Sequence, residues 1–562
     1  MIGKTNSQTG STIKTENVNI RLASNQSSSS DINGATVTLA YGSYSKTYTW
    51  SGTEITTSVP EHVTYTLTFS DVSGYKKPSV VTNTAVGGNS RSIVGTYQTQ
   101  LLTVNVVGSG ATPSGYTITV KNKSTGAVIG TQTTSSKVYK IPYGVNYIVS
   151  AGALTGYNAV TDQEGNSNSQ SNSITVTYVY NPTVDLSKQN IYGESTSMTT
   201  ANCYVVSTAG AYMFPLVYGN AFSNGKVNSA AYTKAPGTYS NSHDFVNHLD
   251  DVITSPFIEN HDGCMAESVE LSMADTDGIF SGLEIVEGGN CRYVKFTISS
   301  IPSTGANGVI SILDANGVVI WSWHIWVWPD DLTPVVITNN TGVDYSILPV
   351  NLATKKSTTA GKMYNWFYQW GRPTPMLPPN DYNSTTNATN YGTKTFAVSS
   401  AKADTYGAGI QNPQMFYKGS SSPYNWFGAA SYYNLWDANC VSTGNSDNDV
   451  VKTVYDPCPP GFKMPNGNTF TYFSTSNVVG SFNNGWYFKR NAEDTTGVFF
   501  PASGYRYYSD GSLYSVGSYG YAWPSSAYSQ NSAYYLSFSS SSVDPQNYDT
   551  RSYGYSVRPV QE

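Results

Sequence analysis

Histidine and aspartate gather in one short region, and these residue types could hold a divalent metal. SHDFVNHLDDV starts at Ser242 and HDGC starts at His261, so His243, His248 and His261 share this region with several aspartates. Nitrogen and oxygen ligands of this kind bind divalent cations. His243 and His248 are five residues apart, however, a spacing that suits neither one helix face nor one strand face, and no HExxH motif occurs. We therefore expect no metal site and no cofactor.

Carboxylate pairs would indicate a second kind of chemistry, glycoside hydrolysis. That reaction needs two acids roughly 5–10 Å apart in a cleft. The C-terminal region has few acids, and none belongs to a recognisable acid/base motif; they include Glu493, Asp494, Asp510, Asp544 and Asp549. No GxSxG elbow and no glycine-rich phosphate loop is evident. The sequence predicts that this protein is not an enzyme.

Calcium ligands and cysteine bridges are weaker indications. The oxygen-rich runs Asp544–Asn547 and Trp436–Asn439 could bind calcium, but we interpret both as structural loops. The five cysteines are too scattered for a zinc site. Cys440 and Cys458 are close enough in sequence to form a bridge, with buried free thiols as the favoured alternative.

A tyrosine-, serine- and glycine-rich stretch from Tyr505 to Tyr535 holds almost no charge. Tyrosine provides a large contact area with a polar tip, while serine and glycine provide adaptable hydrogen bonding. This composition favours a recognition surface over a reaction centre. Trp523 and Tyr535 are the aromatic residues of this stretch most expected in a core. The candidate ligand-binding residues are Tyr507, Tyr508, Tyr514, Tyr519, Tyr521, Trp523, Tyr528 and Tyr534.

Composition indicates the elements that position these residues. The chain has 562 residues, only 12% of them charged, with 50 glycines, 45 tyrosines and a net charge of −6. Abundant Thr, Ser and Val in alternation predict strands and turns. No basic run could follow a nucleic-acid backbone, and no apolar run is long enough to insert into a membrane.

An internal repeat lies in the first third of the chain. VPEHVTYTLTFSDVSGY (59–75) aligns without gaps on IPYGVNYIVSAGALTGY (141–157), which pairs Tyr65 with Tyr147 and Gly74 with Gly156. Thr96-Tyr97 and Thr177-Tyr178 also correspond. Repeated units of several short alternating strands predict two immunoglobulin-like β-sandwiches in series, 17–100 and 101–181.

Two further domains are predicted after the repeats. The run GVVIWSWHIWVW (317–328) is almost wholly apolar, which indicates a central strand covered on both faces within a tryptophan-rich β-sandwich domain, 182–350. Aromatic residues beside Gly, Pro and Asn then predict a loop-rich α+β domain, 351–562.

Five ordered motifs of the C-terminal two thirds resemble a known family. GVVIWSWHIWV, YQWGRPTP, YDPCPPGFKMP, FFPASGYR and YGYSVRPV occur in the order of the major paralogous domain first described in Fibrobacter and common in fimbrillin-type surface proteins of Bacteroidota. The resemblance implies a C-type-lectin-like fold that serves adhesion rather than catalysis. Family members often end in cysteine after the terminal arginine, whereas Pro559 follows Arg558 here.

The first residues favour a virion rather than a cell envelope. MIGKTNSQTGSTIKTENVNIRL has no apolar core of the kind a signal peptide needs, and the tandem repeats resemble fibre or tail proteins of Bacteroidota phages. We expect a homo-oligomeric virion protein that docks on other virion proteins through residues 1–16. Its C-terminal domain would bind a host-surface glycan or protein. The alternatives are a bacterial fimbrial-tip or cell-surface adhesin and a purely structural virion decoration protein.

Overall fold

The structure is a computed structural model, and strands dominate it. It describes residues 12–25, 30–154, 156–168, 171–180, 182–237, 240–419, 422, 424–428 and 432–562. The chain divides into an N-terminal unit, Met1–Pro182, and a C-terminal unit, Thr183–Glu562. The prediction of a mainly β, multidomain protein is confirmed. Helical elements among the described residues are η1 (Ser30–Ile32), η2 (Leu186–Lys188), η3 (Ser229–Ala231), η4 (Ile258–Asn260) and α1 (Tyr406–Gln411). None of these helices is long and apolar enough to cross a membrane.

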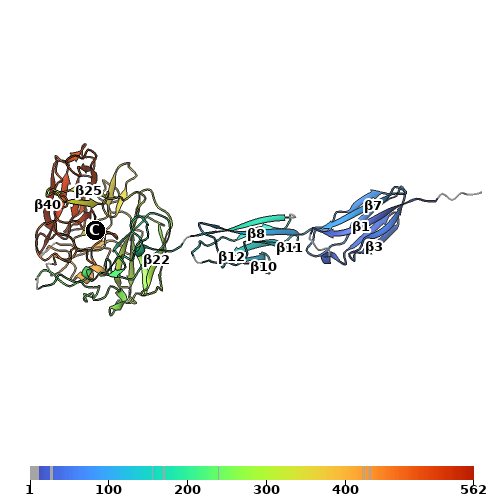
Figure 1. Ribbon diagram of the computed structural model, residues 1–562, viewed down its shortest axis with the longest axis horizontal. Helices are drawn as coiled ribbons and strands as arrows, with labels where there is room; N and C mark the ends of the chain where they lie inside the picture. Colours follow the sequence, from blue (N-terminus) through green and yellow to red (C-terminus); the bar gives the residue numbers. More distant parts are fainter. Residues whose placement is uncertain are drawn as a thin grey trace, which may run out of the picture. The chain divides into compact units, whose positions relative to one another are not determined.

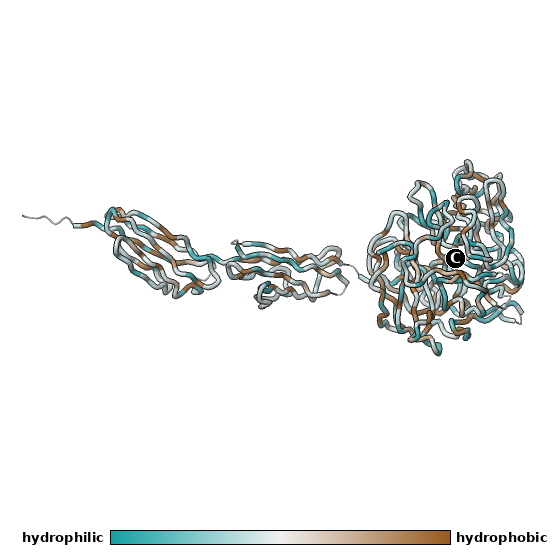
Figure 2. The backbone as a smooth tube through the Cα atoms, turned by 180° about the vertical axis from the view of Figure 1, so that it is seen from behind, coloured by the Kyte–Doolittle hydropathy of each residue, from teal (hydrophilic) through white to brown (hydrophobic). Residues whose placement is uncertain are grey.

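The N-terminal unit contains two β-sandwiches of the same design (Figure 1). In the first, sheet β4-β1-β7 faces sheet β3-β2-β5-β6; in the second, β11-β8-β14 faces β10-β9-β12-β13. Buried and exposed residues alternate along the strands. Figure 2 shows hydrophobic and hydrophilic residues interspersed along them. The strands are β1 (Thr15–Ser24), β2 (Thr36–Tyr41), β3 (Tyr44–Thr49), β4 (Ile55–Pro60), β5 (Thr64–Phe69), β6 (Val81–Thr84), β7 (Ser90–Tyr97), β8 (Gln100–Ser109), β9 (Ile118–Asn122), β10 (Val128–Gln132), β11 (Ser136–Ile141), β12 (Asn146–Ala151), β13 (Gln163–Asn166) and β14 (Ser171–Val179).

The sequence repeat has a structural counterpart at the level of single residues. Gly74 and Gly156 both have a φ of 80°, in the left-handed region that favours glycine. Each precedes a tyrosine that packs edge-on against the last strand of its sandwich. In that strand, the hydroxyl of Tyr97 donates to the carbonyl of Ser70 at 2.7 Å, and that of Tyr178 donates to the carbonyl of Gly152 at 2.8 Å. The repeated residues therefore fix one turn and one strand end in each copy.

A further β-sandwich opens the C-terminal unit. Sheet β15-β17-β22-β21 packs on sheet β16-β24-β23-β20. Strand β24 lies between two neighbours, and each of its residues is buried, as the apolar run predicts. The strands are β15 (Val184–Asp185), β16 (Cys203–Val206), β17 (Gly210–Pro215), β20 (Ser268–Ala274), β21 (Phe280–Val286), β22 (Tyr293–Ile298), β23 (Ala306–Leu313) and β24 (Val319–Val327), with a small hairpin of β18 (Phe222–Ser223) and β19 (Lys226–Val227).

The rest of the C-terminal unit consists of short strands and long loops. Its largest sheet has the order β37-β36-β41-β38-β39-β40, with β29 paired to β41. These strands are β29 (Tyr368–Gln369), β36 (Tyr505–Arg506), β37 (Leu513–Tyr514), β38 (Tyr519–Trp523), β39 (Ser532–Ser539), β40 (Val543–Thr550) and β41 (Gly554–Val557). Smaller sheets hold β25 (Val335–Thr338), β26 (Asp344–Ile347), β27 (Thr354–Lys356), β28 (Met363–Asn365), β30 (Ala397–Val398), β31 (Met415–Phe416), β32 (Phe462–Lys463), β33 (Val478–Val479), β34 (Gly485–Phe488), β35 (Val498–Pro501) and β42 (Val560–Gln561).

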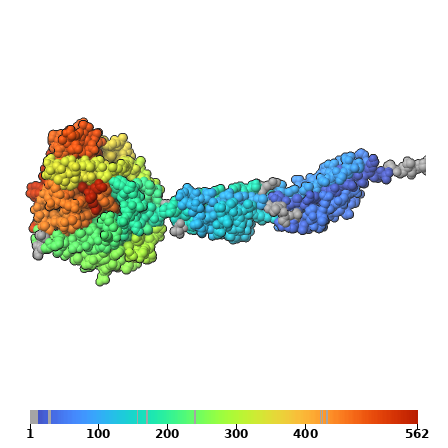
Figure 3. Space-filling model, viewed as in Figure 1, coloured from blue at the N-terminus to red at the C-terminus, as the bar shows by residue number. Residues whose placement is uncertain are grey.

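One hydrophobic core joins the sandwich to the loop-rich part. The side-chain amide of Asn202, in the sandwich, donates to the carbonyls of Val454 and Asp456 at 2.7 and 2.9 Å. Trp321 of β24 stacks on Tyr455, with ring centroids 6.3 Å apart. Figure 3 shows C-terminal residues in orange and red against green residues of the sandwich. The predicted boundary between residues 350 and 351 thus falls inside a single compact unit.

Candidate binding surface

Six tyrosines on β36, β37, β38 and the loop between β36 and β37 form a connected row, which we call the tyrosine face. Neighbouring rings lie 4.8 to 6.2 Å apart between centroids, from Tyr519 at one end to Tyr508 at the other. Opposite residues of an antiparallel pair share a face, and Tyr505 lies opposite Tyr514. The members are Tyr505, Tyr507, Tyr508, Tyr514, Tyr519 and Tyr521.

Two members of the row are exposed, and a second layer of rings supports it. Tyr514 and Tyr519 are 43% and 42% exposed, while the other four are half-buried. Tyr555, nearly fully buried, stacks under Tyr521 at 4.6 Å, and Tyr553 packs against Tyr505 at 5.6 Å. Because a second layer of rings supports them, the exposed tyrosines lose little side-chain entropy when a ligand binds.

One carboxylate accompanies the tyrosine face. Asp549 of β40 is half-buried, and its Oδ1 accepts a hydrogen bond from the backbone N–H of Thr550 at 2.7 Å. Burial raises the pKa of the Asp549 carboxyl above its ordinary value. Burial is the largest cause that raises the pKa values of Tyr521 and Tyr535, and the charge of Asp549 raises both further. The face therefore combines aromatic rings and hydroxyls with the acceptor charge of Asp549.

Two of the predicted binding residues lie in a separate group with a tyrosine that the prediction missed. Tyr528 stacks on Tyr548 with 3.5 Å between ring centroids, and it contacts Tyr534 at 5.2 Å. Tyr548 is 48% exposed. Since Tyr534 lies opposite Tyr548 and neighbouring Tyr535 lies opposite Asn547, this group points to the other side of the sheet from Tyr535. Half-buried and exposed residues alternate along VDPQNYDT of β40. This period of two is the sequence signal that could have placed Tyr548 on the exposed side.

The prediction that Trp523 binds a ligand is wrong. Its side chain has no exposed area, and its indole N–H donates to the carbonyl of Tyr368 at 2.9 Å. The strand that carries it, β38, lies between β39 and β41, and Tyr535 and Tyr555 pack on the indole ring. Trp523 is therefore core, as is Tyr535, in agreement with the expectation for this pair.

The three clustered histidines do not converge on one point. His261 Nε2 accepts the backbone N–H of Thr254 at 3.0 Å, and its ring packs on Tyr218. His243 instead packs on Tyr432. In the described part of the chain, no group of three or more His, Cys, Asp or Glu side chains is arranged to hold a metal ion.

Cys264 and His248 form the pair that most resembles a nucleophile and its base. The thiol sulfur lies 3.8 Å from His248 Nδ1 and 3.4 Å from the side-chain nitrogen of Asn247. Both side chains are buried, however, and burial raises the pKa of the Cys264 thiol to about 11. A reactive cysteine needs a lowered pKa and access to substrate. This pair has neither property and is part of the core.

Carboxylates of the loop-rich part mainly accept hydrogen bonds from backbone N–H groups. Arg490 and several backbone N–H groups bind Asp494, and the hydrogen bond from Arg490 is the largest cause that lowers the pKa of this carboxyl. Asp437, in one of the two runs weighed for calcium, accepts the N–H groups of Asn439 and Val451. Burial raises the pKa of Asp437 to about 6. All five cysteines are free, including Cys440 and Cys458.

Four arginines are buried in the scaffold, and three of them come from the ordered sequence motifs. Each guanidinium donates to backbone carbonyls and lies over an aromatic ring. Among the described residues, no carboxylate forms an ion pair with any of them, and burial lowers the pKa of each. In the motif DPCPPGFKMP, the buried Asp456 accepts the N–H groups of Cys458 and Met464. The four are Arg372, Arg506, Arg551 and Arg558.

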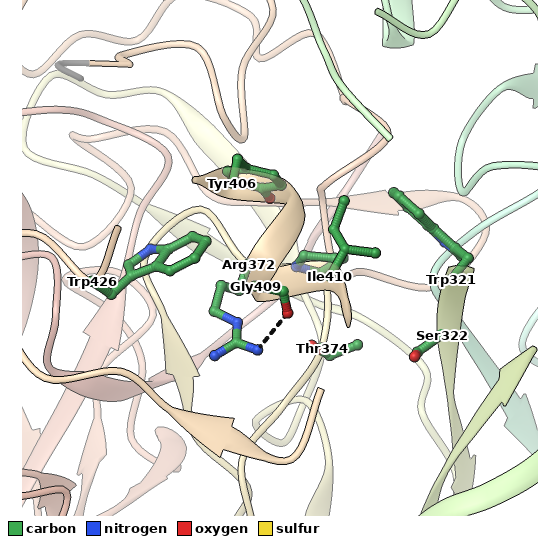
Figure 4. A pocket seen from close by; sticks show the side chains of 9 residues that line it. Trp321, Ser322, Arg372, Thr374, Tyr406, Gly409, Ile410 and Trp426 are labelled. Carbon is green, nitrogen blue, oxygen red and sulfur yellow. Dashed lines mark hydrogen bonds between the residues drawn. The ribbon is translucent and has the colours of Figure 1, made fainter. Parts of the chain in front are cut away.

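A cavity beside one of these arginines is too small for a substrate. Figure 4 shows Trp321, Arg372, Tyr406 and Trp426 around it, with Arg372 Nη2 donating to the carbonyl of Gly409 at 3.0 Å. Its volume is about 10 Å³, which holds about one water molecule. The buried tryptophans therefore line a core rather than a sugar-stacking platform.

Comparisons with known proteins find one family match and several remote structural matches. Residues 474–560 match a domain of unknown function, DUF8237. This segment includes Tyr514, Tyr519 and Asp549 of the surface described above. No curated protein matches the chain.

Three solved structures illustrate the remote matches. The Bacillus anthracis TIE protein is 12% identical, with 56% of this chain and 48% of that chain covered and a TM-score of 0.19. The pilus adhesin SpaC of Lactobacillus rhamnosus GG is 12% identical, with 39% and 34% covered and a TM-score of 0.24. The major pilin of Streptococcus pyogenes is 12% identical, with 30% and 99% covered and a TM-score of 0.18. The chain thus spans about half of the first protein's length, and TM-scores this low establish no common overall fold.

Proposed function

We propose that this is an adhesin-like protein of an exposed surface, which binds its ligand non-covalently through the tyrosine face. The observation that supports this function is the connected row of six rings, exposed at Tyr514 and Tyr519 and supported by a second aromatic layer. Exposed tyrosines on a rigid sheet are typical of recognition surfaces. The two sandwiches of the N-terminal unit serve as spacers.

The ligand of this face is a glycan or a protein of a cell surface. Tyrosine hydroxyls and the Asp549 carboxylate suit hydroxyl and amide donors, and the rings suit the apolar face of a sugar or of a side chain. Placement on a phage particle rests on the sequence analysis alone and stays a prediction. The same holds for the C-type-lectin-like fold and for the homo-oligomer. Of the predicted docking segment, 1–16, residues 1–11 lie outside the described residues.

A cell-binding assay tests the proposal. Fluorescently labelled full-length protein is incubated with a panel of Bacteroidota strains and animal epithelial cells, and binding is measured by flow cytometry. The double variant Tyr514→Ala/Tyr519→Ala removes the two most exposed rings, so we expect at least about a tenfold loss of binding, since aromatic hot spots contribute about 2 kcal/mol or more. Its melting temperature should stay unchanged.

Exposed tyrosines elsewhere provide the matched control. Tyr192 and Tyr487 are 43% and 49% exposed and lie outside the tyrosine face, so Tyr192→Ala/Tyr487→Ala should bind like the wild type. Equal binding by the Tyr514/Tyr519 variant and the wild type would sink the proposal. So would the absence of binding to every cell type in the panel.

A further inference from the structure

A second candidate site lies in the C-terminal unit, in an open cavity that no predicted residue lines. The cavity has a volume of about 270 Å³, and its walls include Leu377, Asn387, Lys394 and Phe396. Pockets for drug-sized ligands run to about 300–1,000 Å³. This cavity is slightly smaller, so it suits a ligand of about one sugar ring.

One wall of the cavity is fixed in place by hydrogen bonds to strand β20. The backbone N–H groups of Tyr391, Thr393 and Lys394 donate to carbonyls of Ala274, Leu271 and Ser272 at 2.8 to 3.0 Å. Gly392 packs so closely on this strand that a Cβ would lie 2.3 Å from the Ser272 carbonyl oxygen. The wall is therefore formed before any ligand binds, and ordering it costs the ligand little.

An aromatic ring forms another part of the cavity. Phe396 is half-buried, and the guanidinium carbon of buried Arg506 lies 4.4 Å from its ring centroid. A ring held against a cation in this way keeps a fixed orientation. Phe396 thus offers the cavity an apolar surface against which the C–H face of a sugar ring can pack.

The polar groups of the cavity are mainly hydrogen-bond donors. Asn387 Oδ1 accepts Arg506 Nη2 at 2.8 Å, which directs the asparagine amide N–H groups elsewhere; among the described residues they have no protein acceptor. Lys394 pairs with Glu270 at 3.4 Å, and Glu270 also accepts the hydroxyls of Ser272 and Thr393.

The charges of Lys394, Glu270 and Arg506 do not balance. Since Arg506 has no carboxylate partner among the described residues, the group Lys394, Glu270 and Arg506 carries one positive charge in excess. An excess positive charge together with free donors favours an anionic ligand.

We propose that this cavity binds one acidic sugar residue, a hexuronate. Its carboxylate accepts hydrogen bonds from Asn387 and Lys394, and its ring packs on Phe396. This site is separate from the tyrosine face, so either proposal can fail without the other.

Ligand-observed saturation-transfer NMR on the full-length protein tests the site with two probes, D-galacturonate and D-galactose. These sugars share the ring, and only galacturonate has the carboxylate. We therefore expect a signal for galacturonate and a signal at least about tenfold weaker for galactose. Asn387→Asp replaces the donating amide by a carboxylate of the same shape and keeps the acceptor for Arg506. It should abolish the galacturonate signal, because like charges at an interface repel, without lowering the melting temperature.

The matched control is Asn383→Asp, which adds the same charge at an exposed position outside the cavity lining. This variant should bind galacturonate as the wild type does. The proposal is overturned if neither sugar gives a signal at 10 mM (roughly the weak end of useful affinity), if both bind equally, or if Asn387→Asp and Asn383→Asp behave alike.

Discussion

The guanidinium of Arg558 lies over the ring of Phe500, with its carbon atom 3.8 Å from the ring centroid. The same group donates to Asn351 Oδ1 at 2.7 Å and to the carbonyl of Phe499 at 2.9 Å, and it contacts the carbonyls of Leu348 and Pro349. One side chain near the end of the sequence thus connects three segments that are far apart along the chain. Arg372, Arg506 and Arg551 do the same for other loops.

Replacement of Arg558 by methionine should destabilise the C-terminal unit. The change removes the donors of several buried acceptors, and each buried acceptor left unsatisfied costs about 1–3 kcal/mol. We expect the free energy of unfolding of this unit to fall by at least about 3 kcal/mol. Differential scanning calorimetry of the full chain should show the transition of the C-terminal unit at a lower temperature and that of the N-terminal unit unchanged. Arg21→Met, at an exposed position, should shift neither transition; an unchanged Arg558→Met profile would contradict the role assigned to Arg558.

His324 should make the C-terminal unit sensitive to acid. Asn307 Nδ2 donates to Asp275, so its Oδ1 accepts from His324 Nε2 at 2.9 Å. The neutral ring therefore carries its proton on Nε2. Burial lowers the pKa of His324 to about 3, whereas an unfolded histidine titrates near 6.5.

The sign of the His324 effect follows from these two pKa values. The unfolded state binds more protons between pH 6.5 and 3, so stability is lost as the pH falls through this window, by at most about 1.4 kcal/mol per pH unit. His324→Gln keeps a donor for Asn307 and should remove this dependence in urea unfolding at pH 7, 5.5 and 4. The control His62→Asn replaces an exposed histidine at a φ of 62°, where asparagine is tolerated. Parallel pH profiles of His324→Gln and the wild type would refute the prediction.

Asp437 should have the opposite dependence on pH. Burial raises the pKa of this carboxyl to about 6 from 3.8, so the folded state binds more protons between these values. Stability is then lost as the pH rises from about 4 to about 6. Asp437→Asn keeps the oxygen that accepts from Asn439 and Val451. It should raise the free energy of unfolding by about 2 kcal/mol at pH 7 and have little effect near pH 4.

The control for Asp437 is Asp510→Asn, because exposed Asp510 also accepts a backbone N–H, that of Ser512, at 2.9 Å. This variant should leave the pH profile unchanged. If Asp437→Asn is less stable than the wild type at pH 7, the burial penalty assigned to Asp437 is wrong.

Gly392→Ala should detach the loop that carries Lys394 from strand β20. The added methyl group would meet backbone atoms of Ser272 and Met273 at 2.3 to 2.5 Å, which cannot move as a flexible side chain does. Overpacking of this kind typically costs about 1–3 kcal/mol. Hydrogen exchange should show lost protection at the amides of Tyr391, Thr393 and Lys394. Gly289→Ala, where a Cβ meets nothing within 4 Å, should exchange like the wild type, and retained protection in Gly392→Ala would contradict the prediction.

Local patterns determined much of the fold. Period-two alternation and turn glycines depend only on neighbouring residues, so they indicated the strands, the repeat and the central position of β24. The tyrosine-rich stretch likewise identified five members of the tyrosine face, because its composition is local. The motifs with Arg372, Arg506 and Arg558 were visible as well, although their role as donors to loop carbonyls was not.

Only the tertiary structure decided which aromatic residues face solvent. Trp523 and Tyr521 are two residues apart on one strand, and both contact Tyr535 and Tyr555. Only the tryptophan is fully buried, with its indole N–H on the distant carbonyl of Tyr368. Tyr548 stacks on Tyr528 through a strand pairing that composition does not encode. The cavity beside Phe396 depends on the contact of Gly392 with β20, more than a hundred residues earlier in the chain. Sequence by itself therefore determined the strands and the composition of the surface, whereas burial and cavities arise from contacts between distant segments and required the folded chain.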